Sequence, residues 1–119
     1  MTIRLKRAYE RAEKDDGVRL LVERLWPRGL TKEKAAIDEW FKDVAPSPGL
    51  RKWYGHDPEK WTEFRRRYLE ELRGNPEEVR KLRARLKNGP VTFVYAAKDE
   101  KLNSARVLKD YLEGREGKP

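Results

Sequence analysis

Three stretches of the chain carry hydrophobic patterns that predict β-strands. Over Ile3–Tyr9 apolar and basic residues alternate, which is typical of a half-buried strand. Val18–Leu25 follows an Asp-Asp-Gly turn, and Pro90–Ala97 is the most apolar stretch, which is typical of a central strand covered on both faces. Since only about eight residues separate the first two strands, antiparallel pairing and a shortened crossover both stay open.

Elsewhere, apolar residues recur at helical spacing. Thr31 is a suitable N-cap for a helix that runs to about Val44. Its buried face would hold four residues: Ile37, Trp40, Phe41 and Val44. The expected helices span residues 31–44, 50–54, 58–73, 76–87 and 101–113, all to within about two residues. Strands that alternate with helices predict an α/β fold: a single compact layered domain with a small three-stranded, mostly parallel sheet and about four to five helices packed on it.

Length and hydropathy fit one small domain. With 119 residues the chain can bury one core, and no repeat or linker marks a second unit. We therefore expect residues 1–113 to form one domain and Gly114–Pro119 to be a flexible tail. No apolar run approaches the roughly 20 residues of a membrane span, and no secretory signal is evident, so we expect a cytoplasmic protein with no membrane partner.

The residue types limit the chemistry. The chain has no cysteine, which excludes disulfides, thiol nucleophiles and zinc sites with thiolate ligands. His56 is the only histidine, so neither a metal site nor a cofactor is expected. Phosphate-loop, dinucleotide and Ser-His-Asp motifs are absent. Charged residues make up 42% of the chain and Cys and Met are nearly absent, a balance that favours a thermophilic source.

The net charge of +8 favours anionic partners, either polyanions or small phosphorylated ligands. Much of the excess lies in two expected helices, Glu63–Arg73 and Val79–Lys87, where glutamates alternate with basic residues. Ion pairs on a solvated surface are the favoured interpretation of this pattern. A nucleic-acid-binding module that uses both helices is the alternative, and a partner-interaction protein with an aromatic surface is a third. The sequence leaves the oligomeric state open.

The exit of the second strand carries the first candidate site. Within Glu23–Gly29, Arg24 and Arg28 can bind phosphate or carboxylate with two hydrogen bonds each, and Gly29 allows close approach of the backbone. Trp26 could line such a site, although large aromatic residues more often belong to a core. The competing interpretation is that both arginines pair with nearby carboxylates. Those carboxylates are Glu23, Asp38 and Asp99.

A second candidate site lies where the central strand ends. Tyr95 and Lys98 leave this strand toward a helix whose N-terminus, capped by Asp99 or Asn103, favours anions. Ligands of open α/β sheets bind beyond the carboxyl ends of the strands. If the second and third strands are parallel neighbours, we expect an anion-binding crevice lined by Arg24, Arg28, Lys98, Tyr95 and Asn103. His56, in a loop beside Asp57, is the candidate acid or base of any catalytic step, although a structural role is the commoner one for such a residue.

Four motifs in this order resemble the YeaO-like branch of the domain-of-unknown-function family 488. They are Arg24–Gly29, Leu50–Pro58, Phe64–Tyr68 and Tyr95–Asp99. The resemblance implies a bacterial or archaeal cytoplasmic α/β protein with a crevice between the Arg24–Gly29 turn, the His56 loop and Lys98, and it implies no particular activity. Distant members carry cysteines in the segment that aligns with Tyr95–Asn103. In this sequence Tyr95 and Asn103 align with those cysteines, so the resemblance implies no thiol mechanism here.

Overall fold

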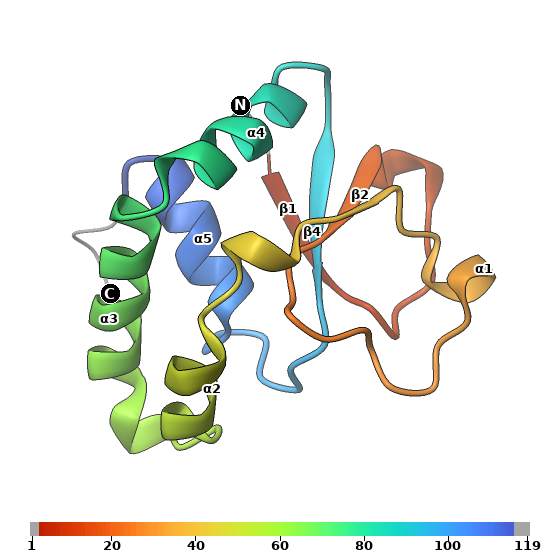
Figure 1. Cartoon of the computed structure of the whole chain (residues 1–119). Coiled ribbons are helices and arrows are strands. Elements are labelled where there is room, and N and C mark those ends of the chain that lie inside the picture. The colour runs from red at the N-terminus through yellow and green to blue at the C-terminus, as the bar shows by residue number, and fades with distance from the viewer. Residues whose placement is uncertain (1–2, 116–119) are drawn as a thin grey trace.

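The apolar stretch after Pro90 forms the centre of a parallel sheet. The computed structural model describes residues 3–115, and in this range four strands lie in the order β1-β4-β2-β3, with every neighbouring pair parallel (Figure 1). The strands are β1 (Ile3–Arg7), β2 (Val18–Leu21), β3 (Glu39–Trp40) and β4 (Val91–Tyr95). The parallel α/β fold is thus confirmed, and the short first connection is a crossover over β4.

The prediction of three strands is wrong by one, because the helix expected over residues 31–44 is a single turn. Helix α1 (Lys32–Ala35) ends where Ala36 adopts the left-handed conformation with φ 49°. The chain then pairs with β2: the Asp38 N–H donates to the Arg19 carbonyl at 2.8 Å, on the approach to the two-residue strand β3. Trp40 is consequently 38% exposed, where a helix would have buried it.

Four longer helices cover one face of the sheet (Figure 1). They are α2 (Pro48–Tyr54), α3 (Trp61–Arg73), α4 (Pro76–Leu86) and α5 (Ser104–Leu112). Alternation in β4 directs Val91, Phe93 and Tyr95 into the core beneath them, where all three are nearly inaccessible. The core therefore sits between the sheet and α2–α5.

The opposite face is covered by loops and α1, and it contains charges. Val94 and Leu21 form a small apolar cluster there, next to the buried ion pair of Asp16 and Arg19. Gly17 closes the loop that bears Asp16, at φ 65°, and a Cβ at this position would lie 2.2 Å from the Pro90 carbonyl oxygen. Only glycine fits this contact between the first crossover and β4.

No helix within residues 3–115 is both long and apolar enough to cross a membrane. Of the predicted C-terminal tail, Gly114 and Arg115 follow α5, and residues 116–119 lie outside the described residues.

Candidate functional site

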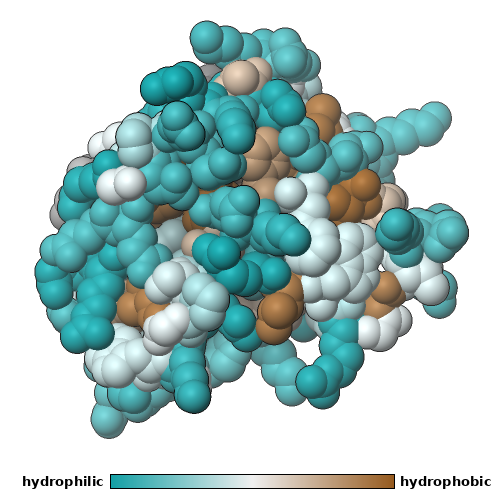
Figure 2. Space-filling model, viewed as in Figure 1, coloured by the Kyte–Doolittle hydropathy of each residue, from teal (hydrophilic) through white to brown (hydrophobic). Residues whose placement is uncertain are grey.

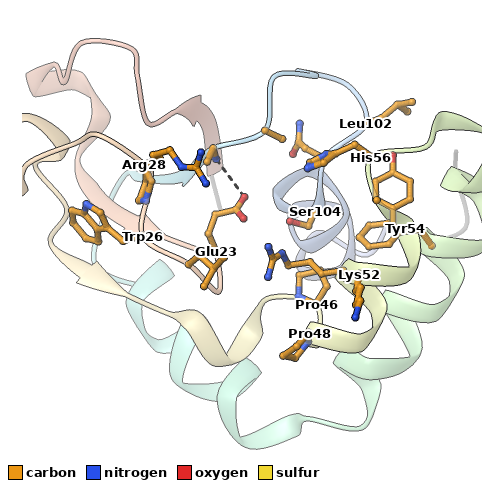
Figure 3. A pocket seen from close by; sticks show the side chains of 18 of the residues that line it. Glu23, Trp26, Arg28, Pro46, Pro48, Lys52, Tyr54, His56, Leu102 and Ser104 are labelled. Carbon is orange, nitrogen blue, oxygen red and sulfur yellow. Dashed lines mark hydrogen bonds between the residues drawn. The ribbon is translucent and has the colours of Figure 1, made fainter.

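A pocket of about 970 Å³ opens at the carboxyl edge of the sheet. Residues just after β2 and β4 form one wall, and α2 with the start of α5 forms the other (Figure 3). The Arg7 side chain supports this edge by donating from Nε to the Ala97 carbonyl at 3.0 Å. The location agrees with the rule that parallel sheets bind ligands beyond the carboxyl ends of their strands.

Three cationic side chains line this pocket: Arg28, Arg51 and Lys52. Arg28 extends from the turn after β2, and its carbonyl oxygen accepts a 3.0 Å hydrogen bond from the Tyr9 hydroxyl. Arg51 and Lys52 belong to α2, whose N-cap Ser47 accepts from the backbone of the first turn. All three side chains are exposed to solvent, so they are able to meet an incoming ligand.

His56 stands on the α2 wall, opposite Glu23 and Arg28 (Figure 3). It follows the left-handed C-cap Gly55 and is itself left-handed, with φ 58°. A non-glycine residue in this conformation stores strain, which is tolerated in turns and is common at binding sites. Its ring centroid lies 6.2 Å from that of Tyr54, which supports the imidazole from the core side.

Glu23 provides the carboxylate of the pocket. Its Oε1 accepts from the Ala96 N–H at 3.3 Å, which links the exits of β2 and β4, and Figure 3 shows the side chain directed into the pocket. Burial raises the pKa of Glu23, against the opposing effects of the Ala96 hydrogen bond and the positive charge of Arg51. Among the described residues none forms an ion pair with Glu23, and Oε2 accepts no hydrogen bond from them.

Arg24 lies outside this pocket and has a structural environment. Its guanidinium donates to the carbonyls of Ala45 (3.0 Å) and Pro46 (3.2 Å) and lies 3.6 Å from Asp43. The side chain faces a separate hollow of about 390 Å³ beside α3. Arg24 therefore holds the segment that leads into α2.

The other predicted site residues divide into two groups. Trp26 and Asn103 line the pocket, although each makes a structural hydrogen bond: Trp26 Nε1 donates to the Leu30 carbonyl at 2.8 Å, and Asn103 Oδ1 caps α5. Gly29, Tyr95 and Lys98 are outside the lining. Tyr95 is 3% exposed in the core, whereas Gly29 and Lys98 lie on the surface. The structure thus brings Arg28, Trp26, His56 and Asn103 together and separates them from the remaining four.

Sequence reasoning missed Glu23, Arg51 and Lys52 as pocket residues. Glu23 follows the buried run that ends β2, so its position at a strand exit was a usable signal. The two cations of α2 had no such signal, because only the packing of α2 against the core brings them to the sheet edge.

Basic side chains of α3 and α4 are largely paired with acids. Arg66 contacts both Glu63 and Glu70, and Arg67 shares Glu63 while lying over the Trp53 ring. On α4, Arg85 pairs with Glu39 of β3 at 2.6 Å. Figure 2 shows a mainly hydrophilic face with apolar residues in small patches. These pairs agree with a solvated surface and reduce the charge that α3 and α4 offer to nucleic acid.

Metal ligands do not gather in the described residues: no group of three or more His, Cys, Asp or Glu side chains lies in a position to hold an ion.

Comparisons with known proteins identify relatives across nearly the whole chain. Residues 2–117 match a family model described as the inactive DUF488-N3 subclade. The uncharacterised protein YeaO of Escherichia coli is 44% identical over 112 residues, which cover 94% of this chain and 97% of YeaO. The uncharacterised protein Rv3073c of Mycobacterium tuberculosis is also 44% identical, over 115 residues that cover 95% of each chain. No solved structure gives a significant match. The chain therefore belongs to the YeaO-like DUF488 family.

Proposed function

We propose that the pocket at the carboxyl edge of the sheet binds a small organic anion, with a phosphate or carboxylate group between Arg28, Arg51 and Lys52. The observation that carries the proposal is the presence of three exposed cations and one carboxylate, Glu23, in the lining of this pocket of about 970 Å³. Arginine binds both kinds of anion through paired hydrogen bonds, and lysine adds a point charge.

The start of α5 adds to the positive potential. Asn103 and Ser104 line the pocket at the N-terminus of this nine-residue helix. The first N–H groups of a helix lack partners within it, and the helix dipole favours an anion nearby. The side chain of Asn103 satisfies the Arg106 N–H, which leaves the preceding N–H groups for a ligand.

Apolar residues form the rest of the pocket and favour an organic ligand over a bare inorganic ion. Tyr54 and Phe64 stack with ring centroids 4.3 Å apart, and both line the pocket together with Leu102. A volume of about 970 Å³ suits a ligand of nucleotide or cofactor size. Charge at the rim and aromatic walls inside are the features that such an amphipathic anion requires.

The family relationship supports a pocket that binds its ligand without converting it. The matching family model is described as an inactive subclade. We therefore assign His56 the role of a ligand contact at the rim of the pocket, where its imidazole offers an N–H donor. Arg24, by contrast, is proposed to support the site through the backbone at Ala45 and Pro46.

The test is isothermal titration calorimetry with inorganic phosphate, sulfate, nucleotides and organic acids, using the native protein and the variants R28A and R51A. The matched control is R80A, because Arg80 is an exposed residue of α4 outside the pocket and its loss changes the net charge equally. A charge-assisted hydrogen bond contributes about 1.5–3 kcal/mol, so each pocket variant should weaken binding about tenfold or more. Equal affinities in R28A, R51A and R80A, or no binding of any compound, would refute the proposal.

Nucleic-acid binding has less support. It needs unpaired basic side chains on α3 and α4, where ion pairs with Glu63, Glu70 and Glu39 occupy several of them. Should a single-stranded or duplex oligonucleotide bind, its affinity would have to fall steeply with salt and respond to R80A more than to R51A.

A further inference from the structure

We propose that the ligand of this pocket carries an N–H hydrogen-bond donor at the end opposite its anionic group, and that Glu23 binds this donor. The inference rests on the proposed anion site and narrows its ligand to amino- or amide-bearing organic anions. Glu23 is thereby assigned a specificity role that the cationic residues cannot supply.

Glu23 has an unfilled hydrogen-bond acceptor in the pocket. One carboxylate oxygen is fixed by the Ala96 N–H at 3.3 Å, and the other has no hydrogen bond from any described residue. The backbone on either side is also held, because the Trp40 Nε1 donates to the Glu23 carbonyl at 2.6 Å. The carboxylate is therefore positioned by its surroundings and keeps one oxygen free toward the pocket (Figure 3).

The Glu23 carboxylate also has no direct ion pair with the described cations of the pocket. Arg28 and Arg51 line the same pocket, yet within residues 3–115 neither forms an ion pair with Glu23. Burial withdraws this carboxylate partly from water, the positive charge of Arg51 offsets only part of that cost, and carboxylates in such surroundings are common at binding and catalytic sites. The raised pKa of Glu23 has this same physical cause. A ligand donor would supply the missing partner, whereas a purely anionic ligand would be repelled by Glu23.

Aromatic side chains in the lining favour a particular shape of ligand between these groups. Tyr54 and Phe64 provide aromatic surface on the α2 and α3 side, whereas the Trp26 ring is directed away from Glu23 (Figure 3). Aromatic walls favour a flat ring, and a nucleobase such as guanine presents adjacent N–H donors that match the two oxygens of a carboxylate. A small aminoalkyl phosphate offers the same two-ended chemistry without a ring.

The experiment compares ligand pairs that differ in one donor. Calorimetric affinities would be measured for two pairs of compounds. The first pair is 2-aminoethyl phosphate and ethyl phosphate, and the second is guanosine monophosphate and inosine monophosphate, the latter of which lacks the exocyclic amine. With the native protein we expect the donor-bearing member of at least one pair to bind about tenfold more tightly. Success of the first pair alone identifies an ammonium ligand, and success of the second identifies a ring with N–H donors.

Variants E23M and E23Q separate selection from folding. Methionine has similar length and only a weak acceptor in its thioether sulfur, so the donor advantage should be almost abolished in E23M and reduced less in E23Q, whose amide oxygen still accepts. Both variants should bind inorganic phosphate at least as well as the native protein, because a negative charge has left the pocket. Retained phosphate binding also shows that each variant is folded.

The outcomes distinguish this inference from the proposed function. If phosphate and every organic anion fail to bind the native protein, both are refuted. If anions bind through Arg28 and Arg51 but donor-bearing members gain nothing, or keep their advantage in E23M, the inference is overturned and the anion site stands.

Discussion

Removal of the buried carboxylate of Asp16 should destabilise this fold more than loss of an exposed one. In the native protein its Oδ2 lies 2.6 Å from Arg19 Nη1, and the two side chains are 2% and 4% exposed. Arg19 also donates to the carbonyls of Ala35 and Ala36, and Lys6 lies 3.1 Å from Asp16. The change D16N would leave the Arg19 guanidinium buried without its counter-charge, a type of loss that costs about 3–5 kcal/mol.

Urea unfolding followed by tryptophan fluorescence measures this effect. With an m-value near 2 kcal/mol/M, the expected loss lowers the midpoint by roughly 2 M. The matched control E70Q makes the same chemical change in the exposed pair with Arg66, and we expect a midpoint close to that of the native protein. If D16N and E70Q shift the midpoint equally, the buried pair contributes no more than a surface pair and the reasoning is wrong.

The same pair sets a dependence on pH. Burial alone would raise the pKa of Asp16, but hydrogen bonds from the Glu13 N–H, Lys6 and Arg19 outweigh it and lower the pKa below its usual 3.8. A carboxylate with a lowered pKa stabilises the folded state above its unfolded pKa, and this contribution is lost as the pH falls toward the folded value. The difference between the native protein and D16N should therefore shrink below about pH 4. A constant difference from pH 7 to pH 2 would contradict this account.

Three further expectations concern the site and its supports. Because burial raises the pKa of Glu23, the contribution of this one carboxyl group to stability should fall as the pH rises through the carboxyl range. The urea midpoint of E23Q relative to that of the native protein should therefore be higher at pH 8 than at pH 4, and a difference that does not change with pH would count against a desolvated carboxylate. R24A removes hydrogen bonds to two backbone carbonyls, so the free energy of unfolding measured in urea should fall by about 1–3 kcal/mol. Phosphate binding should remain measurable in R24A, and its complete loss in a stable variant would place Arg24 at the ligand. Y68F leaves one buried carbonyl without its donor and should lower stability by about 1–2 kcal/mol, an effect that an unchanged thermal midpoint would disprove.

Local patterns predicted the regular parts of the fold well. The alternation in Ile3–Arg7, the apolar run before Tyr95 and the Asp57-Pro58 start of the helical region each depend on neighbouring residues. Asn103, one of the two residues expected to cap the last helix, likewise caps α5, where its Oδ1 accepts from the Arg106 N–H at 2.9 Å. Such features could be inferred because strand periodicity and capping are properties of short segments.

The error over residues 31–44 has a different origin. Ile37 and Phe41 have helical spacing, but the hydrogen bonds of Asp38 and Phe41 to β2 extend this segment along the sheet. Pairing with a strand about twenty residues away is a non-local interaction, and it overrides the local helix propensity of a segment whose helix ends at Ala36.

By itself the sequence predicted an α/β domain with a small, mostly parallel sheet, and it placed Arg28, Trp26 and His56 near the edge where the residues after β2 and β4 lie. Only the tertiary structure decided which charges share a pocket. It turned Arg24 toward the carbonyls of Ala45 and Pro46, and it brought Arg51 to Glu23 across the sheet edge. The physical reason is that a local hydrophobic pattern determines which residues follow the end of the same strand or helix. The direction of a long charged side chain depends instead on how distant segments pack and on the hydrogen-bond partners that they present.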